Sequence, residues 1–195
     1  MAVFPGDLSS RLNLNVVNDE IHRIVLTEFM GAGKSTVGLL LAGQTGWDFI
    51  DLDTRMETAT NRNARALFDA LGETGFRQLE SDFWAASLQQ MRTVIARGGA
   101  VIDETANQRV LAKSAGSFVV FLDAPFQTLI DRCLREEQQV GATYRPLLHK
   151  IEIAQARYIK RRVLYTNHAH RVIDVSDKSP ESVAQDIWQA IIATH

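Results

Sequence analysis

The chain has 195 residues, 46% of them hydrophobic, so it is long enough to form one domain with a sizeable core. Its formal net charge of −2, without blocks of like charge, argues against a nucleic-acid partner. The single cysteine, Cys133, excludes an internal disulfide, and no apolar run reaches the roughly 18 residues of a membrane helix. The first residues also lack the pattern of a signal peptide, so we expect a cytoplasmic protein that does not bind membranes.

Residues 1–20 show no clear period and contain the turn dipeptide Pro5-Gly6, which predicts a flexible N-terminal extension. Residues 21–195 are predicted to form a single domain in which strands and helices alternate. The predicted strands are residues 24–26, 49–52, 93–96, 118–122 and 172–175. The predicted helices are residues 34–45, 54–59, 63–71, 75–90, 106–114, 125–138, 151–166 and 179–193.

This alternation predicts an α/β fold, because parallel strands joined through helices form a sheet that is covered on both faces. We therefore expect a three-layer α/β/α sandwich around a five-stranded parallel sheet. Ligands of such sheets bind beyond the carboxyl ends of the strands, and the motifs of this chain follow predicted strands.

A glycine-rich turn, EFMGAGKST (residues 28–36), follows the first predicted strand. It is nearly the phosphate-binding pattern G-x-x-x-x-G-K-[ST], with Glu28 in place of the first glycine. Backbone N–H groups of residues 31–36 could surround a phosphate, Lys34 could reach the β- and γ-phosphates, and Ser35 could ligate Mg²⁺. The alternative is a chance glycine turn before a helix.

Two carboxylates, Asp51 and Asp53, end the second predicted strand in the sequence FIDLD. Because strand side chains alternate, both point to one face. One could hold a metal-bound water and the other a substrate hydroxyl. The structural alternative is that Asp53 only caps the helix that follows.

The remaining polar motifs each have a plain structural explanation. Arg77, in GFRQLE, could be an ion-paired helical arginine, and Gly98 and Gly99, in ARGGAV, could form a tight turn. Arg145 lies in REEQQVGATYRP, which is typical of a mobile loop. Arg161, in KRRVLY, could belong to a solvated basic face.

In combination, these motifs make the chain resemble the shikimate kinases, small P-loop kinases of the nucleoside-monophosphate-kinase type. The resemblance runs from about residue 21 to the C-terminus, in the order FMGAGKST, FIDLD, GFRQLE, GGAV, YRPLL and KRRxLY. It implies a P-loop fold with a mobile lid, and ATP-dependent phosphorylation of the 3-hydroxyl of shikimate. Mg²⁺ is the implied cofactor, shikimate and ATP are the implied partners, and a monomer is expected.

The resemblance also implies roles for residues on the acceptor side. Asp53 would bind the shikimate hydroxyls and help to remove the proton of the 3-hydroxyl. Arg77 and Arg161 would bind the carboxylate, a planar task suited to guanidinium groups, while Gly98 and Gly99 would offer backbone contacts. The implied catalytic residues are Lys34, Asp53 and Arg145.

On the nucleotide side, Ser35 would ligate Mg²⁺ directly, and Asp51 would hold a water of its shell. Arg145 would be the lid arginine that neutralises phosphate charge. Arg132 would pack on adenine, with Lys178 and Pro180 forming the other wall. The full set of implied ATP-binding residues is Gly31, Ala32, Gly33, Lys34, Ser35, Thr36, Arg132, Arg145, Lys178 and Pro180.

The chain departs from the family pattern in several places. Glu28 and Arg97 each replace a glycine, Val163 replaces a proline, and the lid from residue 132 to 145 is longer by about six residues. The resemblance implies that the strands ending near Glu28 and Arg97 are parallel neighbours, about 4.8 Å apart, so we expect these two residues to form an ion pair beneath the phosphate loop.

Two other functions remain open from the sequence. One is a related small-molecule kinase that acts on another polyol acid, such as gluconate. The other is a nucleotide-binding protein that has lost catalysis, which Glu28 and Arg97 would support.

Overall fold

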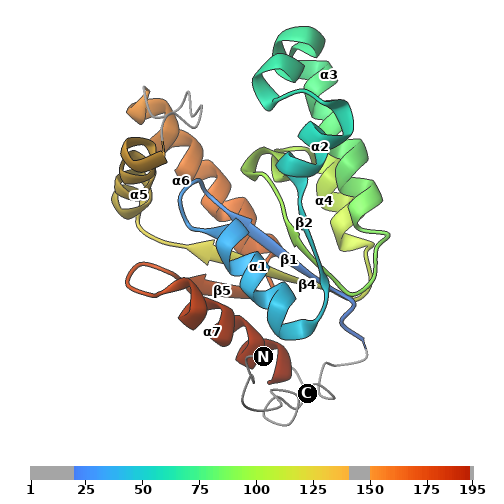
Figure 1. Cartoon of the computed structure of the whole chain (residues 1–195), viewed down its shortest axis with the longest axis vertical. Coiled ribbons are helices and arrows are strands. Elements are labelled where there is room, and N and C mark those ends of the chain that lie inside the picture. The colour runs from blue at the N-terminus through green and yellow to red at the C-terminus, as the bar shows by residue number, and fades with distance from the viewer. Residues whose placement is uncertain (1–19, 141–149, 194–195) are drawn as a thin grey trace, which may run out of the picture.

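Five strands form one parallel sheet in the order β2-β3-β1-β4-β5 in the computed structural model, which describes residues 20–140 and 150–193 (Figure 1). Every strand pairing is parallel, as the alternation of strands and helices predicted. The central strands are buried on both faces, which explains their continuous runs of apolar residues. The strands are β1 (Arg23–Glu28), β2 (Asp48–Asp51), β3 (Thr93–Ala96), β4 (Ser117–Asp123) and β5 (Arg171–Asp174).

Helices cover both faces of this sheet, so the predicted three-layer sandwich is confirmed. In Figure 1, α1 and α7 lie in front of the sheet, and α6 runs behind it. No helix within the described ranges is long and apolar enough to span a membrane. The helices are α1 (Lys34–Thr45), α2 (Leu52–Thr60), α3 (Ala64–Ser87), η2 (Gly99–Asp103, a short 3-10 helix), α4 (Thr105–Ala112), α5 (Phe126–Val140), α6 (Ile151–His168) and α7 (Pro180–Ile192).

The two helices predicted at residues 63–71 and 75–90 form one element, α3. Gly72 inside it has φ 67° and ψ 179°, a backbone conformation that favours glycine, so the predicted interruption is present as a kink. Asn63 caps the start of α3, where its side chain accepts a hydrogen bond from the Ala66 N–H at 2.8 Å.

The helix predicted over residues 125–138 ends later than expected, within the segment REEQQVGATYRP that was predicted to be a mobile loop. Helix α5 continues to Val140, because the Arg, Glu and Gln residues that precede Val140 are good helix formers. Residues 141–149, which include the C-terminal part of the predicted lid, and residues 1–19 of the predicted N-terminal extension lie outside the described residues.

The core contains one charged side chain that the apolar pattern does not explain. Arg97, directly after β3, is 0% exposed, and its Nε, Nη1 and Nη2 atoms have no hydrogen-bond partner among the described residues. Its guanidinium lies over the rings of Trp84 and Tyr165, 5.6 and 5.8 Å from their centroids. Burial lowers the pKa of Arg97 to about 10, so it is still protonated at neutral pH.

Replacing Arg97 by methionine is expected to raise the free energy of unfolding by about 2 kcal/mol, because the variant no longer buries a cation without hydrogen bonds. Chemical denaturation of the wild type and the variant measures the difference.

The matched control is Arg23→Met, which removes a buried arginine that is hydrogen-bonded to Ser117 Oγ at 3.0 Å and to the Gln90 carbonyl at 3.1 Å. This variant should lose stability, because those acceptors would be left without their donor. A similar loss in both variants would contradict the view that the Arg97 charge is poorly compensated.

Candidate active site

The carboxyl ends of β1, β2 and β3 border a cavity of about 640 Å³. The residues that line it come from the end of β1, the turn after it and the start of α1, from α2, from the start of α3, from the turn after β3 and from α6. They include Lys34, Asp53, Gly98, Gly99 and Arg161. The structure therefore brings together predicted residues from distant parts of the sequence, at the edge of the sheet where α/β proteins bind ligands.

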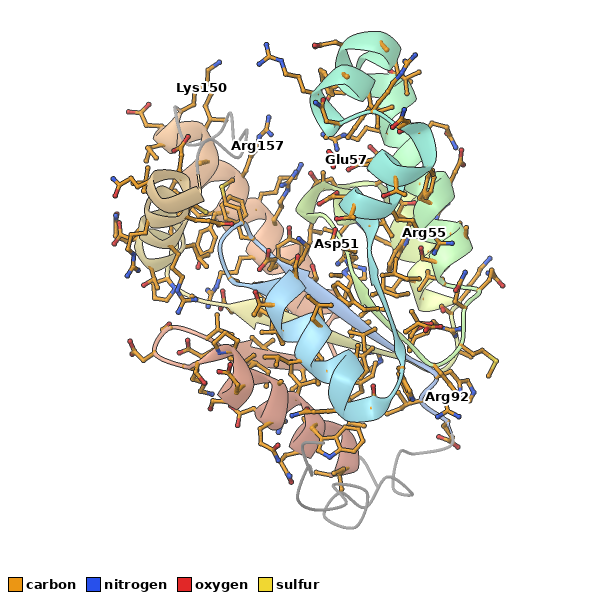
Figure 2. All side chains as sticks on the ribbon, in the orientation of Figure 1. Asp51, Arg55, Glu57, Arg92, Lys150 and Arg157 are labelled. Carbon is orange, nitrogen blue, oxygen red and sulfur yellow. The ribbon has the colours of Figure 1, made fainter. Side chains whose placement is uncertain are left out.

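A second cavity of about 590 Å³ adjoins the first, because Arg161 lines both. Arg77, Arg157 and Lys160 also line this second cavity, so one wall of it is rich in cations. Figure 2 shows Arg157 on α6 and Glu57, which lines the first cavity, on α2, on opposite sides of the opening. The two cavities therefore meet at Arg161, and together they make up the candidate site.

The turn between β1 and α1 has the geometry of a phosphate-binding loop. Gly31 and Gly33 have φ angles of 87° and 93°, which favour glycine, and α1 begins immediately afterwards at Lys34. A Cβ on Gly31 would lie 2.6 Å from the Leu129 carbonyl oxygen and 2.8 Å from Cys133 Sγ, so α5 packs directly on the loop. Gly31, Ala32 and Gly33 form the turn, and Lys34, Ser35 and Thr36 open the helix, whose N-terminus favours an anion.

Glu28 contacts this loop at Lys34. The Lys34 backbone N–H donates to Glu28 Oε2 at 3.0 Å, and Lys34 Nζ lies 3.6 Å from Glu28 Oε1. Burial acts to lower the pKa of Lys34, but the carboxylates of Glu28, Asp53 and Asp51 outweigh it and the pKa is raised. Lys34 is therefore a firmly charged ammonium group at the bottom of the site.

The predicted ion pair between Glu28 and Arg97 is wrong, although β1 and β3 are parallel neighbours as expected. Leu26 pairs with Ala96, so the residue opposite Arg97 is Thr27. Glu28 is therefore offset from Arg97 by one residue in the strand register. Successive strand side chains point to opposite faces. Arg97 accordingly lies against Trp84 and Tyr165, whereas Glu28 contacts Lys34 at the start of α1.

Asp51 connects the phosphate loop to α2. Ser35 Oγ donates to Asp51 Oδ2 at 2.6 Å, while Asp51 Oδ1 accepts from the N–H groups of Asp53 and Thr54 at 3.1 and 3.4 Å. Asp51, not Asp53, is therefore the residue that caps the helix, and the capping role considered for Asp53 is wrong.

The pair of Ser35 and Asp51 fits the oxygen ligands of Mg²⁺, which commonly uses one or two protein oxygens together with substrate phosphates. The described part of the chain has no cluster of three or more His, Cys, Asp or Glu side chains that could hold a metal alone. A metal here would thus depend on the phosphates of a bound nucleotide.

Asp53 faces the site from the first turn of α2. A Cβ on Gly98 would lie 3.1 Å from Asp53 Oδ1, so the absence of a side chain at this position leaves the carboxylate open to the cavity. Burial raises the pKa of Asp53 above its ordinary value, and Asp51 and Glu57 add to this, while Lys34 opposes it. Such a carboxylate is well suited to accept a proton from a bound hydroxyl.

Both predicted carboxylate-binding arginines are already paired with a carboxylate of the protein. Arg77 Nη1 donates to Glu80 Oε2 at 2.5 Å, and Arg161 holds Asp103 through Nε and Nη2, with a shortest distance of 2.7 Å. These contacts fix the orientation of each planar guanidinium. Asp103 was not recognised from the sequence, because only the tertiary fold brings it to Arg161.

Gly99, directly after Gly98, is a further position of the site where a side chain would not fit. A Cβ there would lie 2.7 Å from Tyr165 Oη and 3.3 Å from Arg161 Nη1. The Tyr165 hydroxyl donates to the Gly99 carbonyl at 2.9 Å, and burial raises the pKa of Tyr165 to about 12, so the hydroxyl remains a donor. This contact holds the turn after β3 against α6.

The residues predicted for adenine lie away from these cavities. Arg132 Nη2 donates to the carbonyl oxygens of Val175 and Ser176 at 2.6 and 2.7 Å, which places it beside the segment that carries Lys178. Lys178 Nζ donates to Asp186 at 2.7 Å, and Pro180 is the first residue of α7. Arg145 lies outside the described residues, so its predicted position is not tested.

Known proteins resemble this chain over most of its length. A family model described as shikimate kinase matches residues 30–192. A shikimate kinase of Lactococcus lactis subsp. lactis is 39% identical over 164 residues, which cover 84% of this chain and 94% of the relative. The structure of a shikimate kinase from Acinetobacter baumannii in complex with shikimate has a TM-score of 0.77 at 29% identity, covering 89% of this chain and 94% of that one.

A gluconokinase structure from Sinorhizobium meliloti is a more distant match. Its TM-score is 0.56 at 16% identity, over 91% of this chain and 94% of that one. This similarity concerns the fold alone.

Proposed function

Because the chain belongs to the shikimate kinase family, we propose that it transfers the γ-phosphoryl group of ATP to the 3-hydroxyl of shikimate, giving shikimate 3-phosphate and ADP. The observation that carries this proposal is that a phosphate loop, a half-buried carboxylate and two oriented arginines lie around two cavities that share Arg161. Each element supplies a part that phosphoryl transfer to a small carboxylic acid requires.

The nucleotide would bind with its phosphates on the turn formed by Gly31, Ala32 and Gly33 and on the first turn of α1, Lys34, Ser35 and Thr36. Ser35 and Asp51 would hold Mg²⁺, which neutralises phosphate charge when it is bound. Lys34 is half-buried and charged, and would stabilise the charge that develops on the transferred group. The proposed ATP site also includes the lid arginine Arg145 and the adenine-binding residues Arg132, Lys178 and Pro180.

The acceptor would bind in the adjoining part of the opening. Its carboxylate would meet guanidinium edges of Arg77 and Arg161 that are not used by Glu80 and Asp103. The backbones of Gly98 and Gly99 would contact its ring at the point where no Cβ intrudes. Asp53 would orient the reacting hydroxyl and accept its proton, since its raised pKa brings it closer to that of a useful base.

Catalysis would rest on positioning and charge neutralisation, because phosphoryl transfer needs little covalent chemistry from the protein. We also propose that the protein acts as a cytoplasmic monomer. The gluconate alternative is not favoured, since the match to a gluconokinase is limited to the fold.

The proposed activity is tested by ADP release with ATP, Mg²⁺ and either shikimate, gluconate or no acceptor. Of these three reactions, we expect turnover only with shikimate, because the two paired arginines are oriented to bind one carboxylate on a compact ring. Turnover with gluconate only would contradict the proposed substrate, and nucleotide binding without any turnover would contradict the proposed catalysis.

Replacing Arg77 by alanine is expected to raise the KM for shikimate about 30- to 150-fold with little change in ATP affinity, since a bidentate charge-assisted contact contributes about 2–3 kcal/mol. Steady-state kinetics at varied shikimate concentration measures this effect. Arg157→Ala is the matched control, because Arg157 is an exposed cation on the wall of the same cavity and has no proposed contact with the carboxylate. Equal KM values for Arg77→Ala and wild type would refute the role of Arg77.

Replacing Asp53 by asparagine is expected to lower kcat at least 100-fold while leaving ATP affinity nearly unchanged, because the amide cannot accept the hydroxyl proton. Burial raises the pKa of Asp53, so wild-type kcat/KM should decline on the acid side at a higher pH than an exposed aspartate would produce.

Asp48→Asn, at the exposed start of β2, should keep the wild-type rate and pH profile. If Asp53→Asn bound ATP poorly but transferred phosphate normally, the roles assigned to Asp51 and Asp53 would have to be exchanged.

A further inference from the structure

Glu28 places a carboxylate on the groups that a phosphate loop offers to phosphate. Its two oxygens contact the Lys34 backbone N–H at 3.0 Å and the Lys34 ammonium group at 3.6 Å. In phosphate loops, backbone N–H groups at the start of the helix and the lysine ammonium are the main ligands of the β- and γ-phosphates. One side chain therefore contacts both kinds of phosphate ligand at once.

The position of Glu28 makes this contact a built feature of the turn. Glu28 is the last residue of β1 and is 8% exposed, and the glycine turn folds the start of α1 back toward it. A helix N-terminus attracts anions in general, so it stabilises a carboxylate in the same way as a phosphate. The two anions require the same N–H group and the same ammonium group, and they repel each other if both are present.

We propose that Glu28 is an internal competitor of the nucleotide phosphates, which must displace its carboxylate from Lys34 before the nucleotide can bind. Glu28 thereby lowers the affinity for nucleotide, and it does so only through the phosphate groups of the ligand. This inference rests on the proposed function in one respect, because it takes the loop as the binding site of nucleotide phosphates. It does not depend on which acceptor molecule receives the transferred phosphoryl group.

The competition is tested by calorimetric titration of the full chain with Mg²⁺-ADP, without acceptor. Glu28→Gln keeps an oxygen that can accept from the Lys34 N–H but removes the charge. We expect this variant to bind ADP at least about 10-fold more tightly than wild type, which corresponds to about 1.4 kcal/mol. Pyrophosphate should show the same direction of change, whereas adenosine, which has no phosphate, should bind equally to both proteins.

Glu57→Gln is the matched control, because it makes the same change of charge at another carboxylate that lines the same cavity. Its affinity for ADP should equal that of wild type. Unchanged or weaker ADP binding by Glu28→Gln would overturn the proposal, as would an equal gain in Glu57→Gln or a gain in adenosine affinity.

A second variant and a structure of the wild type keep the inference testable if Glu28→Gln does not fold. Glu28→Asp retains the charge but withdraws the carboxylate from Lys34, and should bind ADP with an affinity between those of wild type and glutamine. In a crystal of the wild-type protein with ADP, the Glu28 carboxylate should have left the Lys34 N–H to a phosphate oxygen. ADP bound while that hydrogen bond persists would overturn the proposal.

These results are separable from the test of the proposed function. Tighter ADP binding by Glu28→Gln without phosphorylation of shikimate by wild type would support the competition and refute the acceptor. Phosphorylation of shikimate by wild type, together with unchanged ADP affinity in Glu28→Gln, would support the acceptor and refute the competition.

Discussion

The passage from β1 into α1 is the constraint on which the site depends. Two glycines with positive φ reverse the chain within a few residues, so that a helix N-terminus faces the carboxyl edge of the sheet. From there, Ser35 reaches Asp51 at 2.6 Å, and Asp51 in turn caps α2 and aims Asp53 at the cavity. The turn thus positions the phosphate-binding groups directly and the acceptor-binding carboxylate through one intermediate residue.

The two arginines proposed to bind the acceptor carboxylate are each paired with a carboxylate of the protein. Arg77 is paired with Glu80, and Arg161 with Asp103. At these two arginines, a carboxylate ligand is therefore attracted less by net charge than by the fixed direction of the remaining guanidinium donors. This arrangement favours a planar anion of one size and position over anions in general, which is consistent with a kinase for a small cyclic acid.

Local patterns in the sequence predicted the α/β fold and the phosphate loop, whereas the acceptor-binding residues and the adjacency of β1 and β3 were inferred from the resemblance to the family. Apolar runs predicted all five strands, and the turn sequence predicted the loop geometry at Gly31 and Gly33. The predictions that failed depend on how distant segments of the chain align in the tertiary structure. Strand adjacency was inferred correctly for Glu28 and Arg97, but the one-residue offset that sends them to opposite faces depends on how β1 and β3 align. Likewise, no sequence period connects Asp103 to Arg161, which lies 58 residues away.

The contact between Gly31 and α5 has a mechanical consequence. Helix α5 has 15 residues, so it is a rod of about 22 Å at 1.5 Å per residue, and its first half packs on the phosphate loop at Leu129 and Cys133. Because a Cβ at Gly31 would collide with Leu129 and Cys133, no slack separates the loop from this rod. The residues of α5 beyond Cys133 extend about 10 Å from this contact, so a tilt of about 5° caused by movement of the loop would displace the far end of the helix by about 1 Å.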